Sequence, residues 1–591
     1  MANIITADNS KMLRIGKWLG LNQSPDGDTT LEVGQAAVMR NWRITREGHL
    51  QIRPGYAPVC TLSEGSPVQG MWSGYVGGKF HFLATCAGKL WDIDSESRQA
   101  VSVGELEDAP THMFGFGGKV YLLTGSEYYR WDGEGTVEVV EGYIPIVSTA
   151  VPPEGGGTAL ERVNLLTGKR RARFSPDGTA TVFHLPETGT RVFRVEGCEY
   201  ITWRSSAEDG TITFDSPPPA GVNTLTVTWQ KGDGNRAAVT GMKFAESYNG
   251  AADTRVFLYG NGTNTCVYSD LDEFGVPSAE YFPEMNTLAV DSANTPVTAM
   301  IRHYDRLLVF KEDGTYCVQD GTLTLATGEV AAAFTCLPVN RNIGSAPAGQ
   351  VALVENDPVT LHGNGLYRWS LSSAGSRDER NARRISSRAE TTLSSFDPTR
   401  CVLFDDEAEG ELYLLCGGEA LIYNYVADAW YFYTDFPALN MLRMGGMLLF
   451  GGEDGKLYHV SREYRSSDGR EIDAYWESGA MDFGMLWRRK YSTDIWVAMK
   501  PESQARVTVG VETDRRSDYT PKQAAHSLAT LSHTDFAHFS FNTNRKPRVV
   551  RIRPRAKKFA FYKLIISSAS ASATATVLSV DLQVRYAGNV R

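Results

Sequence analysis

The residues with the most regular chemical spacing are basic and lie near the C-terminus. In the stretch RVVRIRPRAKK at 548–558, Arg551, Arg553, Arg555 and Lys557 occupy alternate positions. Side chains alternate between the two faces of a strand, so this spacing predicts one strand face lined by four cations. Such a face could bind an acidic partner or the phosphates of DNA. The alternative is an exposed edge strand that carries charge against aggregation.

Carboxylates at every second position form the next candidate site. The turns at 92–96 and 405–410 resemble calcium loops, in which alternate oxygen ligands converge on one ion. The twelfth position, which should carry a further carboxylate, holds Val103 in one turn and Cys416 in the other. Solvated hairpin turns are therefore the better interpretation, and we predict no metal site.

A cluster of arginines lies in SRDERNARRISSR, at Arg380, Arg383, Arg384 and Arg388. Sialidases use an arginine cluster and other glycosidases use paired carboxylates, so this run is the best argument for a glycan-active protein. A surface loop of mixed charge explains the run without a sugar. The sequence has no phosphate-binding loop, G-x-S-x-G elbow or H-E-x-x-H helix. We predict no enzyme activity, no catalytic residues and no cofactor.

Length and composition indicate the domain organisation of the fold that must position these residues. A chain of 591 residues predicts three or four domains, or one large repeat architecture with appendages. The net charge of −10 argues against a general nucleic-acid coat. Eight cysteines without metal-ligand spacing indicate free thiols in a reducing cytoplasm. No apolar run of membrane-spanning length and no signal-peptide pattern occur, so we expect no membrane span and no conventional secretion.

A repeat organises the middle of the chain. GGKFHFLATCAGKLWDID at 77–94 and GGKVYLLTGSEYYRWDGE at 117–134 align without a gap, and Trp91 falls on Trp131. Each stretch predicts a hairpin of two strands joined by a tight turn. Five further hairpins of this kind are found at 253–270, 304–320, 351–370, 409–426 and 444–460.

The spacing of these seven hairpins is typical of four-stranded propeller blades. A small sheet cannot bury both of its faces alone, but it can do so when sheets are stacked radially. We therefore predict an all-β protein built around a β-propeller of about seven blades. Trp91 and Trp131 are expected to pack one blade against the next.

Two regions fall outside the repeat. The gap after the second hairpin is too long for one blade, and its alternating strands between Pro/Gly linkers at 145–157 and 231–238 predict an inserted β-sandwich. After residue 461 longer alternating strands predict a C-terminal β-sandwich, with a long turn at 567–576. The strands at 36–56 are expected to close the ring. The predicted domains are an N-terminal arm with ring-closing strands (1–60), the first blades (61–144), the inserted β-sandwich (145–238), the remaining blades (239–465) and the C-terminal β-sandwich (466–591).

The segment NWRITREGHLQIRPG at 41–55 resembles the opening of bacteriophage tail proteins of the nozzle or tail-hub type. Its matching residues are Asn41, Arg43, Gly48, Leu50, Arg53, Pro54 and Gly55. The inserted segment around DGTATVFHLP at 177–186 is similar to small β-domains of phage tail and fibre proteins. The part from YWESGAMDFG onward looks like the end of hub proteins.

This resemblance implies a structural protein of the virion tail, made in the cytoplasm of a host bacterium. Such proteins form a ring, usually a hexamer, which continues the DNA channel, helps to retain the packaged genome and anchors fibres or a tail tip. The implied partners are further copies of the chain, the portal and adaptor proteins, tail fibre or tip proteins, and double-stranded DNA that passes without sequence-specific binding. The acidic balance suits a conduit, because DNA that slides should form few phosphate contacts.

Two alternatives to this function remain. The first is a receptor-binding or fibre-attachment component of the same virion. The second is a glycan-active or peptide-binding propeller.

Overall fold

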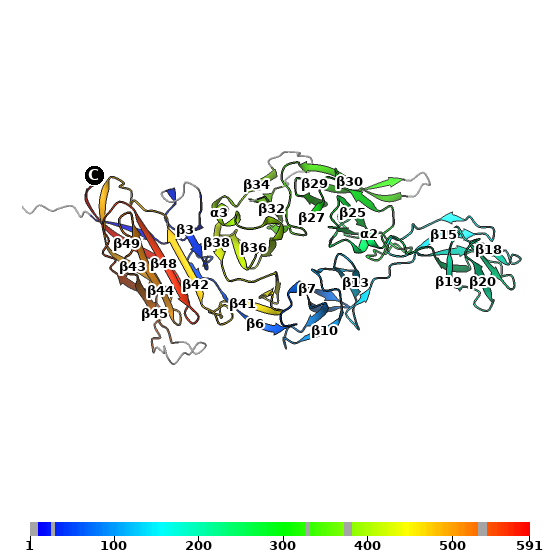
Figure 1. Ribbon diagram of the computed structural model, residues 1–591, viewed down its shortest axis with the longest axis horizontal. Helices are drawn as coiled ribbons and strands as arrows, with labels where there is room; N and C mark the ends of the chain where they lie inside the picture. The colour runs from blue at the N-terminus through cyan, green and yellow to red at the C-terminus, as the bar shows by residue number, and fades with distance from the viewer. Residues whose placement is uncertain are drawn as a thin grey trace, which may run out of the picture. The chain divides into compact units, whose positions relative to one another are not determined.

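The computed structural model describes residues 10–24, 30–324, 330–363, 365–370, 381–529 and 541–590 (Figure 1). The protein is nearly all β, and within this part of the chain its α-helices, α2 (Ala237–Thr240) and α3 (Glu390–Leu393), have four residues each. None of the described helices has the length and apolar character of a membrane span. The chain divides into two compact units, the first formed by Met1–Val68, Ala352–Ser370 and Ala382–Arg591, and the second by Gln69–Val351 and Leu371–Asn381.

Four-stranded sheets recur along the middle of the chain, and the two central strands of each come from one of the seven hairpins. Four such sheets belong to the second unit. The first two contain β7 (Val68–Val76), β8 (Lys79–Cys86), β9 (Lys89–Ile93) and β10 (Ala100–Glu105), and then β11 (His112–Phe116), β12 (Lys119–Leu123), β13 (Tyr128–Trp131) and β14 (Glu138–Val139). The other two contain β23 (Phe244–Ser247), β24 (Val256–Tyr259), β25 (Thr265–Tyr268) and β26 (Thr287–Ala289), and then β27 (Val297–His303), β28 (Arg306–Lys311), β29 (Thr315–Thr324) and β30 (Val330–Asn340).

The first unit holds three more sheets of the same kind: β31 (Ala352–Val354), β32 (Asp357–His362), β33 (Gly365–Trp369) and β34 (Ala382–Arg384); β35 (Val402–Asp406), β36 (Glu411–Cys416), β37 (Glu419–Asn424) and β38 (Ala429–Tyr433); β39 (Asn440–Met444), β40 (Met447–Gly451), β41 (Lys456–Ser461) and β6 (Gly55–Thr61). The last of these sheets differs from the others because its outer strand, β6, comes from the beginning of the chain. Its register runs from Lys456 opposite Thr61 to Ser461 opposite Gly55.

The glycine pairs of the repeat explain how its tight turns form. Gly77 and Gly78 have φ values of 56° and 82°, and Gly117 and Gly118 have φ values of 57° and 78°. A two-residue hairpin turn of type I′ requires positive φ at both central positions, which only a few residue types adopt readily. The paired glycines therefore mark the turn between the first and second strands of these two sheets, β7–β8 and β11–β12.

The inserted segment forms two sheets that share one hydrophobic core. Phe174 and Trp229 from the larger sheet and Phe183 and Ile212 from the smaller one are all fully buried in it. The larger sheet contains β15 (Ile146–Val151), β16 (Thr158–Ala159), β17 (Lys169–Phe174), β19 (Arg191–Glu196) and β22 (Leu225–Gln230), and the smaller one contains β18 (Val182–His184), β20 (Trp203–Ser206) and β21 (Thr211–Phe214).

Part of the linker predicted at 145–157 is in fact a strand. β15 occupies residues 146–151 and pairs with β16 and, in parallel, with β17. Ile146 and Val151 at its two ends are fully buried. Burial of these apolar residues therefore outweighs the turn preference of the prolines and glycines that follow.

The C-terminal region contributes most of two larger sheets. The seven-stranded sheet contains β1 (Ser10–Ile15), β4 (Trp42–Ile44), β5 (Leu50–Ile52), β43 (Arg488–Met499), β46 (Arg548–Ile552), β47 (Lys557–Phe559) and β49 (Thr576–Asn589). The six-stranded sheet contains β2 (Gly20–Leu21), β3 (Gln35–Arg40), β42 (Ile472–Ser478), β44 (Ala505–Thr513), β45 (Lys522–His526) and β48 (Tyr562–Ser570).

The strands expected at 36–56 lie in different sheets. β3 pairs with β42 and β5 pairs with β49, whereas β6, which begins at Gly55 in this segment, pairs with β41 of the last four-stranded sheet. Another expectation for these sheets was wrong. The run at 567–576 is not one long turn, since β48 extends to Ser570 and β49 begins at Thr576. Its small side chains suit the central strand β48, where Ser567 lies opposite both Tyr475 and Thr508.

Candidate functional site

The basic row at the C-terminus is exposed, but it is not one continuous strand. Arg551, Arg553, Arg555 and Lys557 are all exposed, whereas Ile552 and Ala556 between them are buried. The strand is broken after Ile552, and residues 553–556 connect β46 to β47. Arg555 has a φ of 58°, a left-handed conformation that interrupts a strand. The side chains of residues 551–557 therefore alternate between exposed and buried or half-buried as predicted, but these residues do not form one continuous strand.

One end of this row is held by an acidic residue of β43. Arg551 donates to the Asp494 carboxylate from Nε at 2.6 Å, and its guanidinium lies 5.7 Å from the ring centre of Trp496. Arg553 donates to the same carboxylate at 3.2 Å. The hydrogen bond from Arg551 lowers the pKa of Asp494 below its ordinary value. Arg555 and Lys557 form no ion pair with any residue that the structure describes, so their charges face solvent.

The segment that carries the resemblance to tail proteins is buried, and Asn41 lies at its centre. Asn41 is fully buried, with a φ of 57° that asparagine tolerates better than most residues. Its Oδ1 accepts from Arg53 Nε at 2.9 Å and from the Thr434 amide at 3.0 Å. Its Nδ2 donates to Thr434 Oγ1 and to the Asp473 carbonyl, both at 2.8 Å. All four hydrogen-bonding positions of the amide are thus used.

Arg43, two residues further on, forms a buried ion pair. Its side chain is 4% exposed and lies 3.0 Å from Glu411 and 2.9 Å from Glu409. Tyr413 and Tyr431 donate hydrogen bonds to the two oxygens of Glu411. Burial works against the charge of Arg43, but Glu411 and the neighbouring tyrosines outweigh it and raise the Arg43 pKa.

Arg53 is also buried, but its partners are neutral. Its NH2 group donates to Ser467 Oγ at 2.7 Å and to the Thr434 carbonyl at 3.2 Å, and its guanidinium lies 5.7 Å from the ring centre of Tyr433. Burial lowers the pKa of Arg53. Because its donors reach the turn after β38 and the segment after β41, Arg53 ties the N-terminal segment to two other parts of the first unit.

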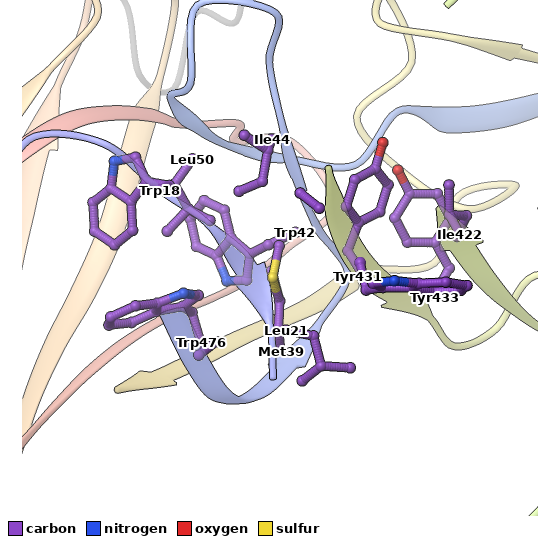
Figure 2. Close-up of a cluster of buried hydrophobic side chains, with 14 of the residues drawn as sticks. Trp18, Leu21, Met39, Trp42, Ile44, Leu50, Ile422, Tyr431, Tyr433 and Trp476 are labelled. Atoms are coloured by element: carbon purple, nitrogen blue, oxygen red, sulfur yellow. The ribbon is translucent and has the colours of Figure 1, made fainter. Parts of the chain in front are cut away.

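Aromatic packing surrounds these two arginines. Figure 2 shows Trp18, Trp42 and Trp476 on one side of the cluster and Tyr431 and Tyr433 on the other. The rings of Trp18 and Trp476 meet edge to face with their centres 4.9 Å apart. All five side chains are at most 2% exposed. These side chains therefore belong to the packed hydrophobic core of the first unit.

The two repeat tryptophans lie in different surroundings. Trp131 is 3% exposed, and its ring centre lies 4.9 Å from that of His81 in the neighbouring four-stranded sheet. His81 in turn contacts Asp92 at 2.9 Å. Trp91 is only half-buried, and its indole nitrogen donates to the Cys86 carbonyl within its own sheet at 3.2 Å. Trp131 thus contacts a second sheet, whereas the one polar contact of Trp91 stays within its sheet.

The other candidate groups are used locally. Arg384 pairs with Glu390 and Arg388 pairs with Asp428, both at 3.2 Å, so these two arginines do not converge on a common point. Arg380 lies outside the described residues. Asp94 accepts hydrogen bonds from the amides of its own turn, at residues 96 and 97. No group of metal-binding side chains occurs within the described ranges.

A groove of about 890 Å³ lies in the C-terminal region and was not predicted. It is lined by three short segments, at 504–506, 525–527 and 572–573, and by residues 542, 544 and 546–549. Its charged lining is basic and consists of Arg506, Lys546 and Arg548, with His526 beside them. No spacing pattern could reveal this groove, because its walls come together only in the fold. The excess of basic over acidic residues after position 465 is a sequence signal that could have indicated a basic surface in this region.

Comparisons with known proteins assign no family to this chain. No family model matches the sequence, and no curated protein matches it. Among solved structures, the extracellular domain of BT4673 from B. thetaiotaomicron aligns with 88% of this chain and 80% of its own, at 8% identity and a TM-score of 0.21. The WD40 domain of SCAP from fission yeast aligns with 69% of this chain and 98% of its own, at 9% identity and a TM-score of 0.27. Similarities this low carry no argument about function.

Proposed function

We propose that this protein is a ring-forming structural component of a bacteriophage tail, of the nozzle or hub type. In this proposal the four-stranded sheets are the blades of a β-propeller, and the inserted and C-terminal regions are β-sandwiches. The ring continues the DNA channel below the portal and its adaptor, helps to retain the genome and anchors fibres or a tail tip. Trp131 and Trp91 pack between blades.

The sheet formed by β39, β40, β41 and β6 supports the propeller. In closed propellers one blade combines strands from both ends of the repeat, which joins the first blade to the last. Here β6 directly precedes the first repeat sheet in sequence and pairs with β41 of the last one. This pairing is what a closed ring of blades requires.

The buried network around Asn41 is the observation that carries the tail function. Asn41, Arg43 and Arg53, on which the resemblance rests, are each at most 4% exposed, and each forms hydrogen bonds or ion pairs inside the first unit. A chance match of polar residues would normally be exposed, since buried polar groups are costly unless they are paired. The matching residues therefore form one structural element, which supports a shared architecture with tail proteins.

The assembly state of the purified full-length chain tests this proposal. Native mass spectrometry should give a closed oligomer, and electron microscopy should show a ring with a pore wide enough for a DNA duplex. A second experiment should find this chain in purified virions, where antibodies against it label the tail. A monomer or trimer that binds host cells would instead indicate a receptor-binding component, and release of sugars from bacterial glycans would indicate an enzyme.

A further inference from the structure

The C-terminal groove has an unbalanced charge. Arg506, Lys546 and Arg548 are exposed on its walls, and none of them forms an ion pair with a described residue. The lining residues include no aspartate or glutamate. Surface cations in folded proteins are usually interspersed with acids, as Arg551 is with Asp494. This groove therefore presents positive charge that the described part of the chain does not neutralise.

A histidine at the wall of the groove has unused hydrogen-bonding capacity. His526, at the end of β45, is 4% exposed, and neither of its ring nitrogens has a hydrogen-bond partner among the residues that the structure describes. Burial and the nearby charge of Arg548 lower the pKa of His526. Buried polar groups are nearly always paired in folded proteins, so an unpaired imidazole at a binding surface suggests a missing partner. An acceptor group that enters the groove would supply it.

The distribution of charge along the chain indicates what this partner is. Residues 466–591 contain 20 lysines and arginines against 12 aspartates and glutamates, which gives a net charge of +8. The whole chain carries −10, so residues 1–465 carry −18. Two copies of the chain can therefore attract each other if the basic region of one meets the acidic region of the next. Such a contact joins different surfaces of the two copies, and repeating it generates a ring or a filament.

We propose that the groove lined by Arg506, His526, Lys546 and Arg548 binds carboxylates on the acidic part of a second copy of this chain. The proposal rests on the proposed function, because it names a contact between subunits of the ring. DNA is a poorer partner for the groove than a second copy, since the acidic remainder of the chain repels phosphates. Binding to DNA is nevertheless one outcome of the test.

The test compares self-association of the full-length wild type with that of a triple variant, Arg506→Glu, Lys546→Glu and Arg548→Glu. Sedimentation velocity across a dilution series measures the association constant at low and at high salt. Like charges placed opposite each other cost several kcal/mol, so we expect association to weaken by about 100-fold in the variant. The wild type should weaken at high salt, where charges are screened.

A control variant separates this contact from a general effect of charge. Arg191→Glu, Arg194→Glu and Arg204→Glu change three exposed arginines of the inserted region and alter the net charge by the same amount. The control should associate at least as tightly as the wild type does, because its changes make the acidic part of the chain more acidic. Circular dichroism and melting temperature should show that both variants fold, because all six side chains are exposed.

Several outcomes would overturn the proposal. Equal association of the triple variant and the wild type would remove the groove from the contact while leaving a ring-forming protein. Equal weakening of the control would show an effect of total charge alone. A wild type that is monomeric at every concentration would reject both the contact and the ring. Loss of DNA binding in the triple variant, with unchanged association, would assign the groove to phosphates.

Discussion

The arginines of this protein fall into two groups that differ in burial and in partners. Arg43 and Arg53 lie near the N-terminus, are at most 4% exposed and use their donors within the first unit. Arg506, Arg548 and Arg555 lie in the C-terminal region, are exposed and form no ion pair with a described residue. The same side chain is thus buried and paired in one region and exposed without an ion pair to a described residue in the other.

The comparison teaches that the partners of an arginine say more about its role than the number of basic residues near it in the sequence. The row at 548–558 is the most conspicuous basic stretch in the sequence, yet Asp494 already engages Arg551 and Arg553. Isolated arginines such as Arg43 are easily overlooked, although a buried charge costs more to disturb than an exposed one. Four sets of variants, ordered from buried to exposed positions, test whether burial sets the cost in stability.

The largest effect is expected from breaking the buried ion pair. Arg43→Met leaves Glu411 buried without its cation, which should cost about 3–5 kcal/mol in the free energy of unfolding. The double variant Arg43→Met with Glu411→Leu should be closer to the wild type, because no unpaired buried charge remains. Urea unfolding followed by fluorescence measures both. A double variant as unstable as the single one would show that the pair matters through its shape and not its charge.

Replacement of Asn41 should have the next largest effect. Asn41→Ala removes hydrogen bonds to buried partners, at about 1–3 kcal/mol, and adds about 1 kcal/mol for a left-handed backbone. Asn41→Gly removes the same hydrogen bonds but accepts the backbone conformation, so it should be the milder change. Thermal unfolding of the two variants separates these contributions. If both melt at the same temperature, the left-handed conformation of Asn41 carries no measurable cost.

Asp494 pairs with exposed arginines of the basic row, and its contribution to the stability of the protein should depend slightly on pH. Its pKa is lowered in the folded protein, so the stability it contributes is present above the ordinary carboxyl pKa of about 4 and is lost as the pH falls through the lower folded value. The melting temperature of Asp494→Asn should be slightly below that of the wild type at neutral pH and should approach it in acid. Its arginine partners are half-exposed or more, which keeps the effect small.

The smallest effect on folding is expected at the unpaired end of the row. Arg555→Glu with Lys557→Glu should change stability by less than about 0.5 kcal/mol, since neither side chain has a described ion pair to lose. If the row is a subunit or adaptor interface, the same variant should fail to assemble while its monomers stay folded. Normal assembly would leave the row without a role in the ring and would sharpen the contrast with the groove.

Much of the fold could be predicted from local patterns. Turn residues and alternating strands marked seven hairpins, because a two-residue turn and a period of two are properties of adjacent residues. The long gap after the second hairpin located the inserted region for the same reason. The prediction failed for β15, where burial of Ile146 and Val151 decided the structure, and for residues 553–556, where the backbone leaves the strand.

The sequence by itself determined an all-β chain, the positions of its hairpins, the inserted region and the excess of basic residues after residue 465. Only the tertiary structure decided that β5 pairs with β49 and that Asn41 bonds to Thr434, because these partners lie hundreds of residues apart. The same holds for the groove, whose basic side chains come from separate segments. Local preferences act between neighbours along the chain, whereas burial and charge pairing depend on which distant segments meet.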